Sequence, residues 1–159
     1  MAIRIIRVGE DPVLRQKAKE VTKFTPAIAK LLNDMAETMR DADGVGLAGN
    51  QIGILKRLIV MDVGQGVIEL VNPVILEKRG TQYGSEGCLS LPGLSGKVSR
   101  AEYVRIRAQD RHGESFELEG RELLARCIQH EIDHLDGILF TDYLQPHEIE
   151  RAVAAEERS

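Results

Sequence analysis

The 159 residues are 43% hydrophobic and 29% charged, as expected for a soluble globular chain forming one domain over residues 1–159. A net charge of −4 without long Lys/Arg runs excludes a basic field for nucleic acid, so we expect no direct nucleic-acid readout. The sequence has neither a membrane-spanning apolar stretch nor the pattern of a signal peptide in MAIRIIRVGEDP, which predicts a cytoplasmic protein with no membrane partner.

The first third of the chain predicts two helices. Asp11 and Pro12 form an N-cap followed by proline, which predicts a short helix through about Glu20. Thr25 and Pro26 repeat this pattern, and apolar residues then recur at helical spacing until the stretch DADG ends the helix. We expect this apolar face to pack in the core (Ile28, Leu31, Leu32, Met35 and Met39).

The middle of the chain predicts strands. The stretches RLIVMDV, VIELVNPVIL and YVRIRAQD are rich in β-branched and apolar residues. Asp110 to Gly113 is a turn sequence that leads into the alternating stretch ESFELEG, so we expect a hairpin there. His112 lies in this turn and is interpreted as a solvated loop residue.

The last third returns to a helical pattern. An apolar stripe begins after Arg121 and ends at Asp136 and Gly137, and it consists of Leu124, Ile128, Ile132 and Leu135. The final stretch PHEIERAVAAEERS predicts a short polar helix with His147 exposed. The fold class expected is α+β, with mixed or antiparallel sheets around the helix that carries QHEIDH and with helices at the N-terminus.

The motif QHEIDH places two histidines four residues apart on that helix. Positions four apart are separated by about 6 Å along a helix and about 40° around it, so His130 and His134 can address one metal ion. Glu131 lies about 100° further round and is free to address a water instead. The alternative interpretation is a pair of histidines satisfied by hydrogen bonds on a helix face.

A catalytic site of this kind needs a third protein ligand, and the chain has two cysteines. Cys127 is on the same helix, but its short side chain leans toward the N-terminus, away from an ion between the histidines. Cys88 lies in GSEGCLSLPG, where glycines allow its thiol to approach the helix from a separate segment. We therefore favour Cys88, and a Cys-His-His set leaves a fourth position for the water of a hydrolase.

The stretch DGVGLAGNQIG, Asp43 to Gly53, contains four glycines and one amide among apolar neighbours. Glycines let a backbone approach a ligand closely, and the amide of Gln51 can donate to a developing oxyanion. A phosphate loop is the competing interpretation, but the Gly-Lys-Ser/Thr ending is absent.

The segments GVGLAGNQ, EGCLS and QHEIDHLDG, in this order and spacing, resemble the three motifs of bacterial peptide deformylases. The likeness extends to FTDYL near Tyr143 and so covers nearly the whole chain. The resemblance implies a metallohydrolase that removes the N-formyl group from the formyl-methionine of nascent polypeptides and releases formate. The ribosome near its exit tunnel is a further partner that this substrate suggests.

The same resemblance implies roles for individual residues. The metal ligands are Cys88, His130 and His134, and the ion is natively Fe(II), although this ligand set does not by itself separate iron from zinc, nickel or cobalt. Glu131 is general base and then acid, while Gln51 and the backbone N–H of Leu89 stabilise the oxyanion. The implied substrate-binding residues are Val45 and Gly46 as a strand edge, Gly87, and Ile128 near the pocket for the methionine side chain.

Two features depart from the family pattern. Gly49 and Asn50 stand where the family usually has Ala-Pro, so we expect Gln51 to be held less rigidly. No basic side chain follows Cys88 until Lys97. This departure leaves the peptide preference beyond the first residue open. Glu86 and Arg100 are expected to form an ion pair that ties the Cys88 loop to the next strand.

Two other classes of protein compete with a deformylase. The first is another metal hydrolase, such as a peptidase built on HExxH, which Cys88 disfavours because such zinc peptidases usually take an oxygen or nitrogen third ligand. The second is a catalytically silent metal-binding or ribosome-associated homologue, which Gly49 and Asn50 make conceivable. The complete set of candidate site residues argues against a silent protein.

Overall fold

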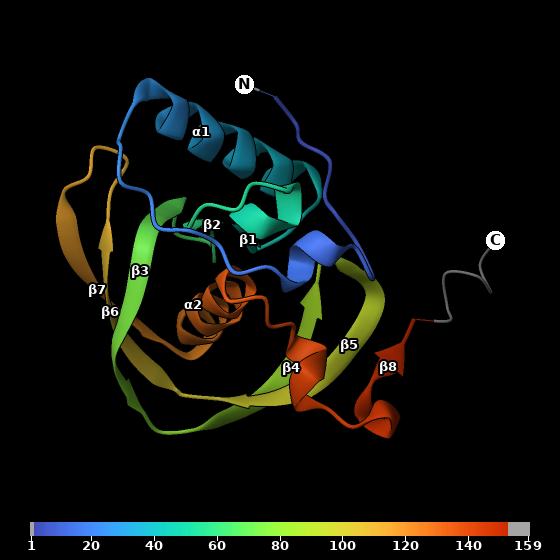
Figure 1. The fold of residues 1–159 in the computed structure, drawn as a ribbon. Coiled ribbons are helices and arrows are strands. Elements are labelled where there is room, and N and C mark those ends of the chain that lie inside the picture. Colours follow the sequence, from blue (N-terminus) through green and yellow to red (C-terminus); the bar gives the residue numbers. More distant parts are fainter. Residues whose placement is uncertain (1, 153–159) are drawn as a thin grey trace.

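The computed structural model describes residues 2–152, which form two sheets and two α-helices (Figure 1). The first sheet has the order β1-β2-β3-β6-β7 and the second has the order β4-β5-β8, with antiparallel pairing throughout. The α+β class predicted from the sequence is confirmed. The element bounds are α1 Pro26–Asp41, α2 Glu122–Leu135, β1 Gly46–Ala48, β2 Leu58–Met61, β3 Ile68–Arg79, β4 Gln82–Cys88, β5 Leu91–Arg100, β6 Tyr103–Gln109, β7 Ser115–Arg121 and β8 Glu150–Arg151.

Helix α2 lies between the two sheets, and helix α1 covers the opposite face of the larger sheet (Figure 1). Strand β2 is apolar throughout because both of its faces are buried. Because successive side chains point to opposite faces, Ile59 and Met61 join the α2 core while Leu58 and Val60 join the α1 core. The apolar face predicted for α1 is buried as expected, with Leu31 at its margin.

The expected helix after Asp11 is wrong beyond its first turn. Pro12–Arg15 form a single 3-10 turn, capped by the Asp11 carboxylate, which accepts from the N–H of Val13. The chain then runs extended, because the N–H of Ala18 donates to Leu135 and that of Lys19 donates to Leu55. These contacts with distant segments replace the helical hydrogen bonds.

The polar C-terminal helix is also wrong within the described residues. Pro146–Glu148 form a 3-10 turn, and β8 then pairs with Leu94 and Ser95 of β5. Leu144 anchors this segment by packing close to Gly96 and against the smaller core beside β5. The rest of the predicted helix, residues 153–159, lies outside the described residues.

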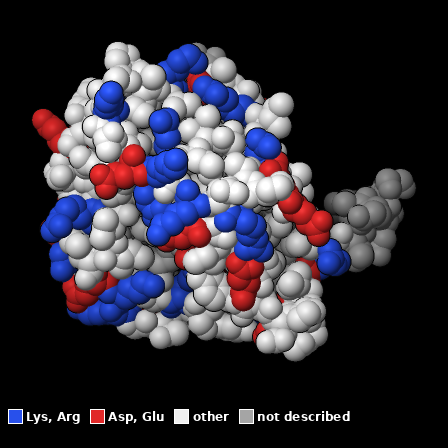
Figure 2. All heavy atoms as spheres, in the orientation of Figure 1, with Lys and Arg blue, Asp and Glu red and all other residues white. Residues whose placement is uncertain are grey.

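The charged side chains are interspersed on the face drawn in Figure 2, where positive and negative groups alternate. His112 and His147 are both exposed, as predicted. The predicted turn before β7 is present, since the N–H of Gly113 donates to the carbonyl of Asp110. Across residues 2–152, no helix combines the length and apolar character needed to cross a membrane.

Candidate metal centre

Three side chains from two separate elements meet at one point. Cys88 ends strand β4, and His130 and His134 lie one turn apart on α2. Their potential ligand atoms all lie within 4.8 Å of one another, and Cys88 Sγ is 3.2 Å from His134 Nε2. The fold therefore brings together the three residues that the sequence nominated as metal ligands.

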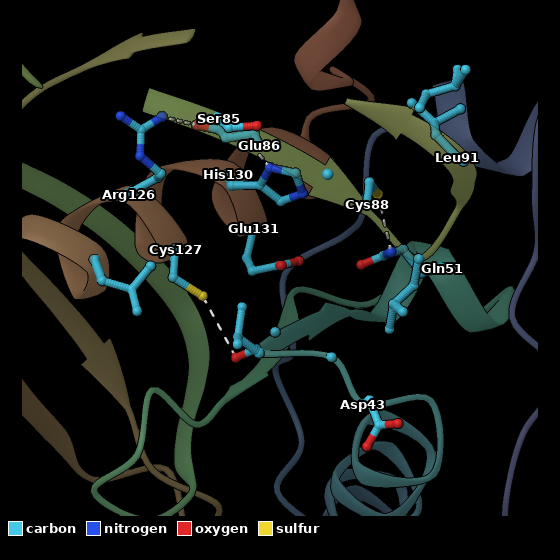
Figure 3. A pocket seen from close by; sticks show the side chains of 18 residues that line it. Asp43, Gln51, Ser85, Glu86, Cys88, Leu91, Arg126, Cys127, His130 and Glu131 are labelled. Atoms are coloured by element: carbon cyan, nitrogen blue, oxygen red, sulfur yellow. Dashed lines mark hydrogen bonds and ion pairs between the residues drawn. The ribbon is translucent and has the colours of Figure 1, made fainter. Parts of the chain in front are cut away.

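Cys127 is placed differently. Its thiol is buried and donates to the carbonyl of Val45 at 3.6 Å, on the side of α2 that faces β1 (Figure 3). Burial raises the pKa of this thiol well above its usual range, so it stays protonated at neutral pH. A protonated thiol is a poor metal ligand.

Glu86 orients His130. Its carboxylate accepts from His130 Nδ1 at 2.9 Å, which leaves Nε2 of that ring free for an ion. Arg100 donates twice to the same carboxylate, at 2.8 and 2.9 Å, which is the ion pair expected from the sequence. Burial alone would raise the pKa of Glu86, but hydrogen bonds from Arg100 and His130 hold it at about 2.

Two further residues extend this network. Arg126 Nη1 donates to Glu86 at 2.6 Å and to the carbonyl of Val98 at 3.0 Å. Arg100 also reaches Asp133 at 2.7 Å. Sequence reasoning missed Arg126, although a buried arginine one residue before Cys127 on an amphipathic helix is itself a signal that a carboxylate lies nearby.

Two buried atoms test whether this centre suits a metal ion. His134 Nδ1 and Glu131 Oε1 have no hydrogen-bond partner among the described residues. Burial lowers the pKa of His134 well below its usual value, so its imidazole is neutral and can ligate. One thiol and two imidazoles form a donor set that suits a first-row divalent metal, so the residues present fit the group.

A cavity of about 430 Å³ opens beside these residues (Figure 3). Gln51 stands in its wall, where its Nε2 donates to Ser90 Oγ at 3.1 Å and lies 3.6 Å from Cys88 Sγ. Its Oε1 accepts from the N–H of Ala48 at 2.9 Å, which fixes which end of the amide faces the cysteine. The amide donor of Gln51 therefore faces Cys88 and Ser90.

The structure brings most of the predicted substrate-binding residues to this cavity. Val45, Gly46 and Gly87 line it, as does Leu89, which was predicted as an oxyanion donor. Ile128 does not, because it is fully buried and packs under the sheet against Gly120. Helical spacing explains the difference, since the cavity face of α2 consists of Leu123, Arg126, Cys127, His130 and Glu131.

The same spacing places Leu123, rather than Ile128, on the cavity face of α2. Leu123 lies one turn before Cys127 on the cavity face, whereas Ile128 is about 100° away from Cys127 around the helix. Leu123 is also half exposed, as a residue at the cavity mouth would be. Its position four residues before Cys127 on a predicted helix is a sequence feature that could have placed Leu123 on this face.

Strand β1 brings its backbone very close to α2. A Cβ added at Gly46 would lie 2.5 Å from Glu131 Oε2 and 2.9 Å from Cys127 Sγ, so only glycine allows this approach. Within residues 2–152, β1 is also the outermost strand of its sheet and pairs only with β2. Its other edge, beside the exposed Val45, is available to an extended peptide.

The fold and the site together define a class, the metal-dependent hydrolases with an HExxH helix and a third ligand from a neighbouring strand. The family model for polypeptide deformylase matches residues 3–150. The chain therefore belongs to the polypeptide deformylase family. The activity that follows is hydrolytic removal of the N-formyl group from nascent polypeptides.

Individual relatives agree with this assignment over most of their length. The peptide deformylase of Alkaliphilus metalliredigens is 59% identical over 142 residues, which is 89% of this chain and 97% of that protein. That of Caldanaerobacter subterraneus is 54% identical over 154 residues, 94% of this chain and 97% of that protein. The crystal structure of a peptide deformylase from Legionella pneumophila superposes with a TM-score of 0.90 at 48% identity, covering 92% of this chain and 89% of that one.

Proposed function

We propose that residues 1–159 form a single catalytic domain that deformylates formyl-methionyl peptides with Cys88, His130 and His134 as metal ligands. The observation that carries this proposal is the meeting of the three candidate ligands within 4.8 Å of one another, beside a cavity lined by Gln51, Cys88, His130 and Glu131. An ion held by these three residues would polarise the formyl carbonyl and lower the pKa of a water molecule. We propose Fe(II) as the native ion, with zinc, nickel or cobalt able to replace it, because thiolate and imidazole ligation suits all four.

Glu131 is the proposed general base and acid. Its burial raises its pKa to about 7. A carboxyl with a pKa near neutrality can accept a proton from the attacking water and later give it up. The proton goes to the amine nitrogen as the formyl C–N bond breaks, so that water and the formyl peptide yield formate and a free N-terminus.

Gln51 and Leu89 are the proposed oxyanion donors. Charge grows on the formyl oxygen when water adds, and a preorganised donor stabilises that charge by about 3–4 kcal/mol. The Gln51 side-chain amide is preorganised, because its Nε2 donates to Ser90 Oγ and its Oε1 accepts from the N–H of Ala48. The N–H of Leu89 directly follows Cys88 and belongs to the same cavity wall.

The substrate chain is proposed to extend along the free edge of β1 at Val45 and Gly46, opposite Gly87. The first side chain then enters the apolar part of the cavity, between Leu123 and Cys127. Ile128 supports this wall from below. We further propose that the protein acts in the cytoplasm near the ribosomal exit tunnel, because formylated N-termini emerge there.

The proposed activity is tested with formyl-Met-Ala-Ser and unformylated Met-Ala-Ser, using protein purified without oxygen and assayed for metal on the same sample. We expect formate release from the first peptide and no cleavage of the second. Glu131→Ala should retain metal and lose turnover. Cleavage of the unformylated peptide would instead indicate an HExxH peptidase, and metal without formate release would indicate a silent homologue.

A further inference from the structure

The turn that carries the oxyanion donor is tethered by a side chain outside the catalytic set. Gly49–Ile52 form a 3-10 turn, in which Asn50 and Gln51 are both almost fully buried. Asn50 Nδ2 donates to the backbone carbonyl of Gln16 at 2.7 Å. The residue that replaces the family's usual proline thus fixes this turn to the extended segment near the N-terminus.

The same N-terminal segment holds the other side of the oxyanion site. The N–H of Arg7 donates to the carbonyl of Gln51 at 2.7 Å, and the N–H of Gly9 donates to the carbonyl of Ser90 at 2.8 Å. Ser90 in turn receives the amide of Gln51. Residues 7–16 therefore contact both the Gln51 turn and the loop that follows Cys88.

Close backbone packing also holds the first residue of the turn. Gly49 is packed so closely on the carbonyls of Ile54 and Lys56 that a Cβ would lie 2.6 Å from each. This contact restrains one side of the turn, and glycine at that position adds backbone freedom. The amide of Asn50 restrains the opposite side.

We propose that Asn50 is a positioning residue for Gln51, which sets the amide of Gln51 against the reacting oxygen through the hydrogen bond from Asn50 to Gln16. The inference deepens the proposed function and rests on it. If the tether is lost, the turn gains rotational freedom, and the bonds from Gln51 to Ala48 and Ser90 weaken together. The Gln51 amide then remains present but is poorly oriented toward the reacting oxygen. This loss of orientation lowers kcat more than it weakens the binding of substrate.

A double-mutant cycle tests this inference in the metal-loaded protein, with Asn50→Ala, Gln51→Ala and the two combined. We expect Asn50→Ala to lower kcat about 5- to 10-fold, with KM and metal content within about 2-fold of the parent. In the Gln51→Ala background, Asn50→Ala should change kcat by less than about 2-fold. If Asn50→Ala does not fold, Asn50→Ser leaves a smaller void and carries the same cycle.

Hydrogen exchange gives a readout that does not depend on turnover. The N–H of Ala48 donates to Gln51 Oε1, so a mobile Gln51 should expose it, and its exchange should accelerate in Asn50→Ala. Asn72→Gly is the matched control, because Asn72 also ties a side-chain amide to an N-terminal carbonyl, that of Val21 at 2.8 Å, but away from the cavity. It should lower the melting temperature and leave kcat and Ala48 exchange unchanged.

Three results would overturn the inference. They are equal kcat losses for Asn50→Ala in both backgrounds, unchanged Ala48 exchange, and a kcat loss in Asn72→Gly as large as that in Asn50→Ala. Each would show that Asn50 does not orient the Gln51 amide and contributes at most to the general stability of the fold. Absence of formate release from the unsubstituted, metal-loaded protein would instead refute the proposed function itself, so the two failures are distinguishable.

Discussion

Glutamine and glutamate have nearly the same shape, yet we expect Glu86→Gln to destabilise the fold strongly and to weaken metal binding. The Glu86 carboxylate accepts four hydrogen bonds, two from Arg100 and one each from Arg126 and His130. Glutamine keeps one acceptor oxygen but turns an NH₂ group toward donors that need an acceptor. Breaking a buried ion pair by removing one partner costs about 3–5 kcal/mol, so we expect the free energy of unfolding to fall by that amount.

The same substitution should weaken metal binding, because His130 loses the carboxylate that orients its ring. Loss of such a partner costs about 10- to 100-fold in metal affinity. Urea unfolding and competition with a chelator measure the two effects. Glu77→Gln is the control, since Glu77 makes only surface ion pairs with Arg79 and Arg105 and should cost less than about 1 kcal/mol. A Glu86→Gln protein as stable as the Glu77→Gln control would refute the reasoning.

Three further predictions concern the close approach of β1, the cysteines and acid stability. Gly46→Ala should destabilise the fold by about 1–3 kcal/mol and reduce kcat/KM about 100-fold, because its Cβ would displace Glu131; unchanged kinetics would contradict this contact. Cys127→Ser should keep stoichiometric metal while Cys88→Ser loses it, as elemental analysis will show, and the opposite pattern would reverse the ligand assignment. A hydrogen bond from Arg4 is the main cause that lowers the pKa of Asp34 from 3.8 to about 2. The contribution of the Asp34 carboxylate to stability is therefore complete above about pH 4 and is lost as pH falls toward 2. Between these pH values, the free energy of unfolding of the metal-free protein should fall less steeply in Asp34→Asn than in the parent. Equal slopes of unfolding free energy against pH would contradict this prediction.

The features predicted correctly from the sequence depend on local spacing. The two histidines and Glu131 are neighbours on one helix, and the apolar face of α1 follows the same period. These helical features could be predicted because helix geometry alone fixes them. Cys88 lies beside the two histidines, as expected from comparing how far the two cysteines can reach from the helix.

The features that were missed depend on contacts between distant segments. The chain after Arg15 is extended because it bonds with Leu55 and Leu135, and the segment after Glu148 is a strand because β5 offers an edge. The sequence position of Arg126 indicates a nearby carboxylate, but only the fold shows that this carboxylate is Glu86, 40 residues away. Secondary-structure propensities cannot account for such partners, because the partners lie dozens of residues away in the sequence.

The expectation that Gly49 and Asn50 leave Gln51 loosely held also changes in the light of the fold. Asn50 donates to Gln16, 34 residues away in sequence, a bond that proline could not form. The sequence alone offered only the lost stiffness of proline. The hydrogen bond from Asn50 joins two segments that are distant in the sequence, so the sequence alone could not predict it.

The central claim is a single metal ion held by Cys88, His130 and His134. X-ray absorption of the zinc-substituted protein tests it directly. We predict one sulfur at about 2.3 Å and two imidazole nitrogens at about 2.0–2.1 Å, with an identical spectrum for Cys127→Ser. Two sulfurs, no sulfur, or a sulfur that disappears in Cys127→Ser would contradict the account.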